Sequence, residues 1–266
     1  MMAAVLDWIT PEFGPAETAL TALVASLLMH QVATCSPRRL EQLYARIEAG
    51  PAARTRAFRA TTAAKVLLAA ITLEITVFSA GVRPADLGLR PVTGAEMFAT
   101  AALTAAVVIG TVVTARRYAR NPPARVDRAT YRHALVMRPR TPAERRWAPA
   151  AALAEAVAAP LVHQGLLIAA GVALGLPVPA AALISAGLWG LTSRAFGFAA
   201  VTSTTVLALV FTFCYATFGS LLVPMVLYAA VQLSSVFLLA RPATGPAEPA
   251  TPPLAFAPDS LTVAPD

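Results

Sequence analysis

The stretch APAAALAEAVAAPLVHQGLLIAAGVAL, residues 148–174, decides the fold class. It carries only two ionisable side chains, Glu155 and His163. A helix of about 20 apolar residues crosses the roughly 30 Å of hydrocarbon in a bilayer. The stretch is also too long and too uniformly apolar for a strand of a membrane barrel. It therefore predicts a transmembrane helix.

The rest of the chain repeats this pattern. Hydrophobic residues make up 57% of the 266 residues and charged residues 13%, against roughly a quarter charged in soluble domains. The predicted spans cover approximately residues 13–34, 61–80, 95–115, 148–174, 179–192, 197–218 and 221–240. We therefore expect an all-α, polytopic transmembrane bundle of about seven helices, formed by residues 1–240.

The basic residues are distributed unevenly between the loops. With seven spans, segments 36–60 and 116–146 fall on one side together with Lys65, Arg194 and Arg241, which places 19 of the 21 basic residues there. The opposite side holds Arg83 and Arg90. The positive-inside rule then predicts a cytoplasmic (plasma) membrane protein with its N-terminus outside and its C-terminus in the cytoplasm.

The net charge of +7 raises the question of nucleic acid. Because the arginines lie in loops between apolar blocks, we expect them to face anionic lipid, so the predicted partner is the lipid bilayer and not nucleic acid. The tail of residues 241–266 contains seven prolines and predicts disorder. Cys35 and Cys214 lie in or beside apolar blocks and are expected to be packing residues.

Ionisable residues inside a span are costly and so are candidates for a site. Glu155 and His163 are eight residues apart, about 80° around a helix and roughly 12 Å along it. A kink at Pro160 does not bring them within reach of one metal ion. We expect Glu155 to be protonated or hydrogen-bonded and His163 to form an interhelical hydrogen bond. Ser193 is followed by Arg194, which is no base, and no phosphate-binding loop or His-Glu-x-x-His motif is present.

Several motifs in the C-terminal half resemble the CPBP intramembrane metalloproteases, also called the CAAX protease or Abi family. TPAERRW at 141–147 looks like the lead-in to the first catalytic helix, and ADLGLR at 85–90 looks like an earlier family feature. APLVHQG at 159–165 stands where the family has Glu-Glu-x-x-x-Arg-Gly. WGLTS at 189–193 matches Phe-Gly-Leu-x-His, and GSLLVPMVLYAAVQ at 219–232 matches Gly-Ser-Leu-x-x-Pro-x-x-x-His-x-x-x-Asp/Asn. The resemblance implies a CPBP-like core over residues 141–240.

The residues that would do the chemistry differ. The family's two glutamates, arginine, two histidines and last polar ligand correspond here to Ala159, Pro160, Gln164, Ser193, Tyr228 and Gln232. The resemblance implies a divalent metal such as zinc, but alanine and proline cannot bind one, and the other side chains are poor zinc ligands. We therefore expect no catalytic residues, no metal and no cofactor, that is, a pseudoenzyme.

Three functions remain as hypotheses. The first is a membrane binding or scaffold protein whose former catalytic cavity holds a peptide or lipid segment, or a protein partner. The predicted cavity residues are Glu155, Ala159, His163, Ser193, Tyr228 and Gln232. The second is an active intramembrane metalloprotease that uses Glu74, Glu155 and His163. The third is a transporter, with helix breaks at Pro160 and Pro224.

Overall fold

The computed structural model describes residues 12–78, 81–120 and 136–239, and every regular element in these ranges is helical. The all-α prediction is therefore confirmed for the described residues. The predicted tail at 241–266 and much of the second Arg-rich segment, at 121–135, lie outside them. The elements are α1 Pro15–Thr34, α2 Pro37–Glu48, α3 Pro51–Phe78, η2 Pro84–Leu87, α4 Gly94–Arg120, α6 Pro142–Pro160, η3 Leu161–Leu167, α7 Ile168–Ala173, α8 Val178–Leu191, η4 Arg194–Phe196, α9 Phe198–Phe218 and α10 Leu222–Leu239.

Four helices are long and apolar enough to cross a membrane: α1, α4, the continuous stretch α6–η3–α7, and α9. Two further apolar helices, α8 and Leu222–Val236 of α10, are shorter. The second predicted span lies in α3, which contains Lys65 and Glu74 and is not among the four. Among the described residues, these four candidate crossings support the prediction of a helical membrane protein.

One segment expected as a loop is helical. Residues 36–60 contain α2 and the first turns of α3. Ser36 caps α2 by accepting a hydrogen bond from the amide of Arg39, with Pro37 at the first helical position. Tyr44 and Ile47 of α2 are buried against Val136. An amphipathic helix with a proper N-cap therefore forms here despite its arginines.

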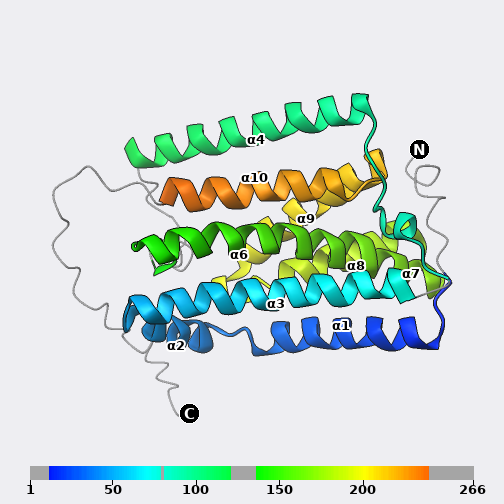
Figure 1. Ribbon diagram of the computed structural model, residues 1–266, viewed down its shortest axis with the longest axis horizontal. Helices are drawn as coiled ribbons and strands as arrows, with labels where there is room; N and C mark the ends of the chain where they lie inside the picture. Colours follow the sequence, from blue (N-terminus) through cyan, green and yellow to red (C-terminus); the bar gives the residue numbers. More distant parts are fainter. Residues whose placement is uncertain (1–11, 79–80, 121–135, 240–266) are drawn as a thin grey trace, which may run out of the picture.

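The main helices lie side by side with nearly parallel axes, and the chain reverses direction from one to the next (Figure 1). α6 lies between α3 and α10, α4 packs on the outer side of α10, and α1 packs beside α3. We call the end where α3 and α6 begin the basic end. The basic residues at that end include Arg38, Arg39, Arg46, Arg54, Arg56, Arg59, Arg116, Arg138, Arg140, Arg145, Arg146 and Arg194, whereas Arg83 and Arg90 lie at the opposite end.

The basic end is held together by a buried ion pair. An Arg54 guanidinium nitrogen lies 3.5 Å from a carboxylate oxygen of Glu144, and both side chains are almost fully buried. Glu144 also accepts hydrogen bonds from the amides of Arg140 and Thr141, and Thr141 caps α6 in return. One carboxylate therefore starts α6 and ties it to α3.

The opposite end is closed by the segment that follows α3. Gly88 adopts a left-handed conformation (φ 74°), and its carbonyl accepts a hydrogen bond from the amide of Leu221 at 2.8 Å. Arg90 donates to the carbonyls of Phe218 and Gly219 and pairs with Glu96. A Cβ on Gly88 would lie 2.3 Å from the Tyr215 ring, so this close approach requires glycine. The stretch that resembles the family feature at 85–90 is therefore fixed against the α9–α10 turn.

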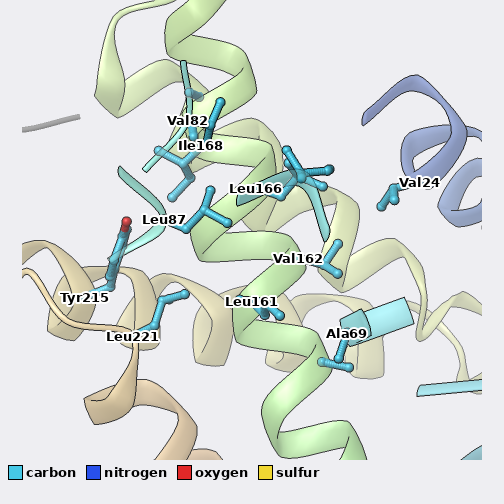
Figure 2. Close-up of a cluster of buried hydrophobic side chains, with 14 of the residues drawn as sticks. Val24, Ala69, Val82, Leu87, Leu161, Val162, Leu166, Ile168, Tyr215 and Leu221 are labelled. Carbon is cyan, nitrogen blue, oxygen red and sulfur yellow. The ribbon is translucent and has the colours of Figure 1, made fainter. Parts of the chain in front are cut away.

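The centre of the bundle is the stretch after Pro160. Proline lacks an amide hydrogen and disturbs the helical hydrogen-bond ladder, and the backbone continues as the π-helical segment η3. Leu161, Val162 and Leu166 of η3 are buried among side chains of several other elements (Figure 2). The core therefore positions η3, and with it His163.

Candidate functional site

A small cavity of about 30 Å³ lies between α1, α3, α6, η3 and α8. Its polar lining comes from five side chains: Gln31, Lys65, Glu155, His163 and Thr192. Leu28, Leu68, Ala158, Ala159, Val162 and Trp189 provide the apolar lining. Of the predicted cavity residues, Glu155, Ala159 and His163 line it; Ser193, Tyr228 and Gln232 are not part of its lining.

Lys65 and Glu155 form an ion pair across the α3–α6 contact. The ammonium nitrogen lies 2.8 Å from a carboxylate oxygen, and each side chain is 21% exposed. The sequence placed Lys65 among the basic residues of the cytoplasmic side and left Glu155 protonated or hydrogen-bonded. The structure gives each the other as a charged partner, and a paired charge is how ionisable groups are normally tolerated within a membrane span.

His163 is buried, and its ring lies parallel to the Trp189 indole with centroids 5.1 Å apart. Its Nδ1 atom is buried and has no hydrogen-bond partner among the residues that the structure describes. The interhelical hydrogen bond that we expected from this side chain is made by its backbone instead, since the His163 carbonyl accepts from the Ser185 hydroxyl at 2.6 Å. The ring is therefore held by stacking and faces a cavity that contains an ion pair.

An aromatic cluster joins Trp189, which lines the cavity, to Tyr228 and Phe211, which do not. Tyr228 meets the indole edge-on at 5.2 Å, and Phe211 packs against both rings. Gln232 donates a hydrogen bond to the Tyr228 hydroxyl at 3.0 Å. Such aromatic pairs stabilise packing beyond their buried area by about 0.5–1.5 kcal/mol each. Tyr228 and Gln232 are therefore parts of one packed unit.

The other positions that match the family's catalytic residues have separate environments. The Ser193 hydroxyl lies 2.9 Å from the Thr204 hydroxyl, so Ser193 bonds to α9 rather than to the cavity. Pro160 and Gln164 are buried, and within the described ranges Gln164 Oε1 has no hydrogen-bond partner. Only Ala159 both occupies such a position and lines the cavity.

The donors present do not fit the zinc that the resemblance implies. Catalytic zinc takes three protein ligands and a water. Glu155 and His163 are side chains that can bind zinc. Glu155 is already paired with Lys65, however, and the positive charge of Lys65 repels a cation. Glu74 is exposed on α3 and does not line the cavity. Across the described ranges, no three His, Cys, Asp or Glu side chains are grouped to hold a metal ion.

Comparison of the chain with protein-family models, curated proteins and solved structures gave no match. The site is therefore described by its own geometry.

Sequence reasoning missed two parts of this site. Lys65 is the only lysine of the chain and lies between apolar residues, and that isolation is a signal that could have identified it as a site residue. Trp189 carried no such signal, because an apolar helix gives no indication of which aromatic residue will stack on a histidine. The arrangement can offer a ligand a carboxylate, an ammonium group and hydrogen-bonding side chains beside an apolar wall.

Proposed function

We propose that this chain is a plasma-membrane protein of about seven spans with a CPBP-like bundle, and that it acts as a membrane binding or scaffold protein without peptidase activity. The four membrane-length helices support the membrane location. The alternating chain direction and the single basic end support a topology with the basic end in the cytoplasm. In that topology α1 begins outside.

The observation that carries this proposal is the packing of Tyr228, Gln232 and Trp189. In the motif that resembles the CPBP family, Tyr228 stands in place of a histidine and Gln232 in place of the last polar ligand. Here Gln232 donates a hydrogen bond to Tyr228, and the Tyr228 ring packs against the Trp189 indole. A metal centre needs ligand atoms that point into open space, and these side chains fill that space instead.

The cavity beside this cluster, at about 30 Å³, is the proposed binding site for one polar group of a peptide or lipid segment, the rest of which would lie against α1. α1 forms one of its walls through Leu28 and Gln31, and only 17% of the α1 span is buried in the bundle. A segment that enters beside α1 would reach the Lys65–Glu155 pair and the Trp189 ring together. Its polar group would then bond to the ion pair while its apolar part covers the aromatic wall.

Photocrosslinking in native membranes tests this site. Benzoylphenylalanine in place of Thr192, which lines the cavity, is expected to give a discrete adduct that Ala159→Phe greatly reduces, because the larger ring fills the cavity. The matched control is benzoylphenylalanine in place of Phe198, which is 86% exposed at the same end of the bundle. Identical adduct patterns from both positions, unchanged by Ala159→Phe, would contradict the proposal.

A second candidate function has one observation in its favour: Glu155 and His163, although two helical turns apart, line the same cavity. An active protease with a relocated site would use this pair. Cleavage of a membrane-embedded reporter peptide that is lost in both Glu155→Gln and His163→Ala, but kept in Glu74→Gln, would establish that function in place of the binding role.

A further inference from the structure

The two sides of α2 carry opposite charges. Arg39 and Arg46 are seven residues apart and so lie within about 20° of each other around the helix. Leu43 falls within about 60° of both. Glu41 and Glu48, also seven residues apart, lie about 150° away on the other side. The helix therefore has a basic side that includes a leucine and an acidic side without one.

The basic side of α2 is exposed and is not the side that packs on the bundle. The face of α2 that packs on the bundle is formed by Tyr44 and Ile47, which are buried against Val136. Arg39 and Arg46 are exposed, and Leu43 is 45% exposed. Within the part of the chain that the structure describes, neither guanidinium has an ion-pair partner. An exposed leucine between two unpaired arginines is the pattern of a helix that lies at a membrane surface.

The position of α2 fits that surface. Only two residues separate the end of α1 from the start of α2, and α2 lies beside the first turns of α3 (Figure 1). Arg194 fixes this junction by donating hydrogen bonds to the carbonyls of Ala33 and Cys35. A helix held immediately beyond the end of a membrane span lies at the depth of the lipid headgroups.

We propose that Arg39, Leu43 and Arg46 form a binding surface for anionic phospholipid in the leaflet at the basic end. Guanidinium groups bind phosphate oxygens in a bidentate manner, and the arginine stems and Leu43 can rest on the upper acyl chains. The acidic side then faces away from the lipid phosphates. This surface differs from the general attraction of basic loops, because it depends on two arginines rather than on total charge. It rests on the proposed membrane crossing of α1.

Lipid-specific quenching in nanodiscs tests this surface. The full chain, with Cys35→Ser and Cys214→Ala, carries a fluorophore on Gln42→Cys, an exposed position on the basic side of α2, so that Arg39, Leu43 and Arg46 all stay in place. It is placed in phosphatidylcholine nanodiscs that contain phosphatidylglycerol, and one lipid or the other bears a spin-label quencher at equal mole fraction. We expect quenching by labelled phosphatidylglycerol to exceed quenching by labelled phosphatidylcholine by roughly two- to fivefold.

Matched variants separate a specific surface from diffuse charge. Arg39→Gln with Arg46→Gln should bring the quenching ratio to about one, whereas Arg38→Gln with Arg56→Gln, the same charge change at the same end, should leave it unchanged. A fluorophore on Glu48→Cys, on the acidic side, should show no preference. A ratio of about one in the parent protein, or an equal fall in both double variants, would overturn the proposal.

A further label separates this outcome from a failure of the membrane topology. A fluorophore on Leu23→Cys, which is exposed on α1, should be quenched equally by both lipids if α1 crosses the bilayer. If Leu23 is quenched but the Gln42 position shows no preference, only the lipid-binding surface is wrong. If Leu23 is not quenched, the proposed membrane crossing of α1 is wrong, and the lipid-binding surface fails with it.

Discussion

The stretch α6–η3–α7 and the helix α4 are both apolar enough to cross a membrane, but they occupy opposite environments. Residues Pro142–Ala173 are 78% buried over their most apolar window, whereas Gly94–Val113 are 0% buried. The central stretch presents small side chains such as Ala152, Ala156 and Ala158 to its neighbours, and small residues let membrane helices approach closely. Gly94–Val113 also contains many small residues, among them Ala101, Ala102 and Ala105, yet it is not buried. Hydropathy therefore identifies both candidate spans, but neither hydropathy nor side-chain size alone shows which of them is buried and carries the site.

The two helices begin with the same capping motif, but the motif is buried in one helix and partly exposed in the other. Thr141 and Glu144 start α6 by reciprocal hydrogen bonds, and Thr93 and Glu96 do the same for α4. Glu144 is fully buried with Arg54, while Glu96 is 19% exposed and pairs with Arg90. The same local motif is thus part of the core in one helix and of the surface in the other.

The largest effect is expected from Glu144→Ala. Removal of one partner leaves the Arg54 charge buried and unpaired, which costs about 3–5 kcal/mol. Glu96→Ala removes the same motif from α4 and should cost about 1 kcal/mol, since Arg90 keeps its carbonyl partners. Equilibrium unfolding in mixed detergent micelles measures both. Equal losses would mean that burial does not distinguish the two helix starts.

Truncation in the two spans should give the next largest difference. Leu166 is 0% exposed, so Leu166→Ala should destabilise by about 3 kcal/mol through lost contacts and a cavity. Ile109 is 62% exposed on α4, so Ile109→Ala should stay within about 0.5 kcal/mol. The same unfolding measurement applies. A large loss at Ile109 would show that α4 is covered by another part of the protein.

A charge on α4 tests what surrounds it. Ile109→Arg places a guanidinium near the middle of the proposed span and should raise the cost of insertion by about 2.5 kcal/mol. Phe98→Arg, in the first turns of the same helix, should cost less because the long side chain can reach the interface. A translocon insertion assay on the α4 segment in its native context measures both. Free tolerance of Ile109→Arg would place α4 in water.

A smaller effect is expected from the loss of a single hydroxyl in the aromatic cluster. Tyr228→Phe removes the hydroxyl that accepts from Gln232 but keeps the ring against Trp189, so the loss should be about 1 kcal/mol. Tyr228→Ala removes the ring as well and should cost about 3–5 kcal/mol. Unfolding measurements on both variants test this order. A Phe variant as unstable as the Ala variant would mean that the hydroxyl, not the stacking, holds the cluster.

The positions of the apolar helices could be predicted closely from the sequence, but the side-chain contacts between them could not. The span predicted at 197–218 differs by one residue from α9, because length and hydropathy are local properties. The spacing of Leu40, Tyr44 and Ile47 after Ser36 could have identified α2, but the density of arginines led to a predicted loop. The Lys65–Glu155 pair and the stacking of His163 on Trp189 could not be predicted, since each joins separate helices through tertiary packing.

The central claim is that packed side chains stand where the CPBP resemblance implies a metal centre. The zinc content of the purified chain tests this claim most directly. The protein would be prepared without chelators, equilibrated with zinc, desalted and measured by mass spectrometry of the metal. The packing of Trp189, Tyr228 and Gln232 predicts zinc far below one atom per chain, unchanged in His163→Ala. About one zinc per chain, lost in His163→Ala but kept in His30→Ala, would contradict it.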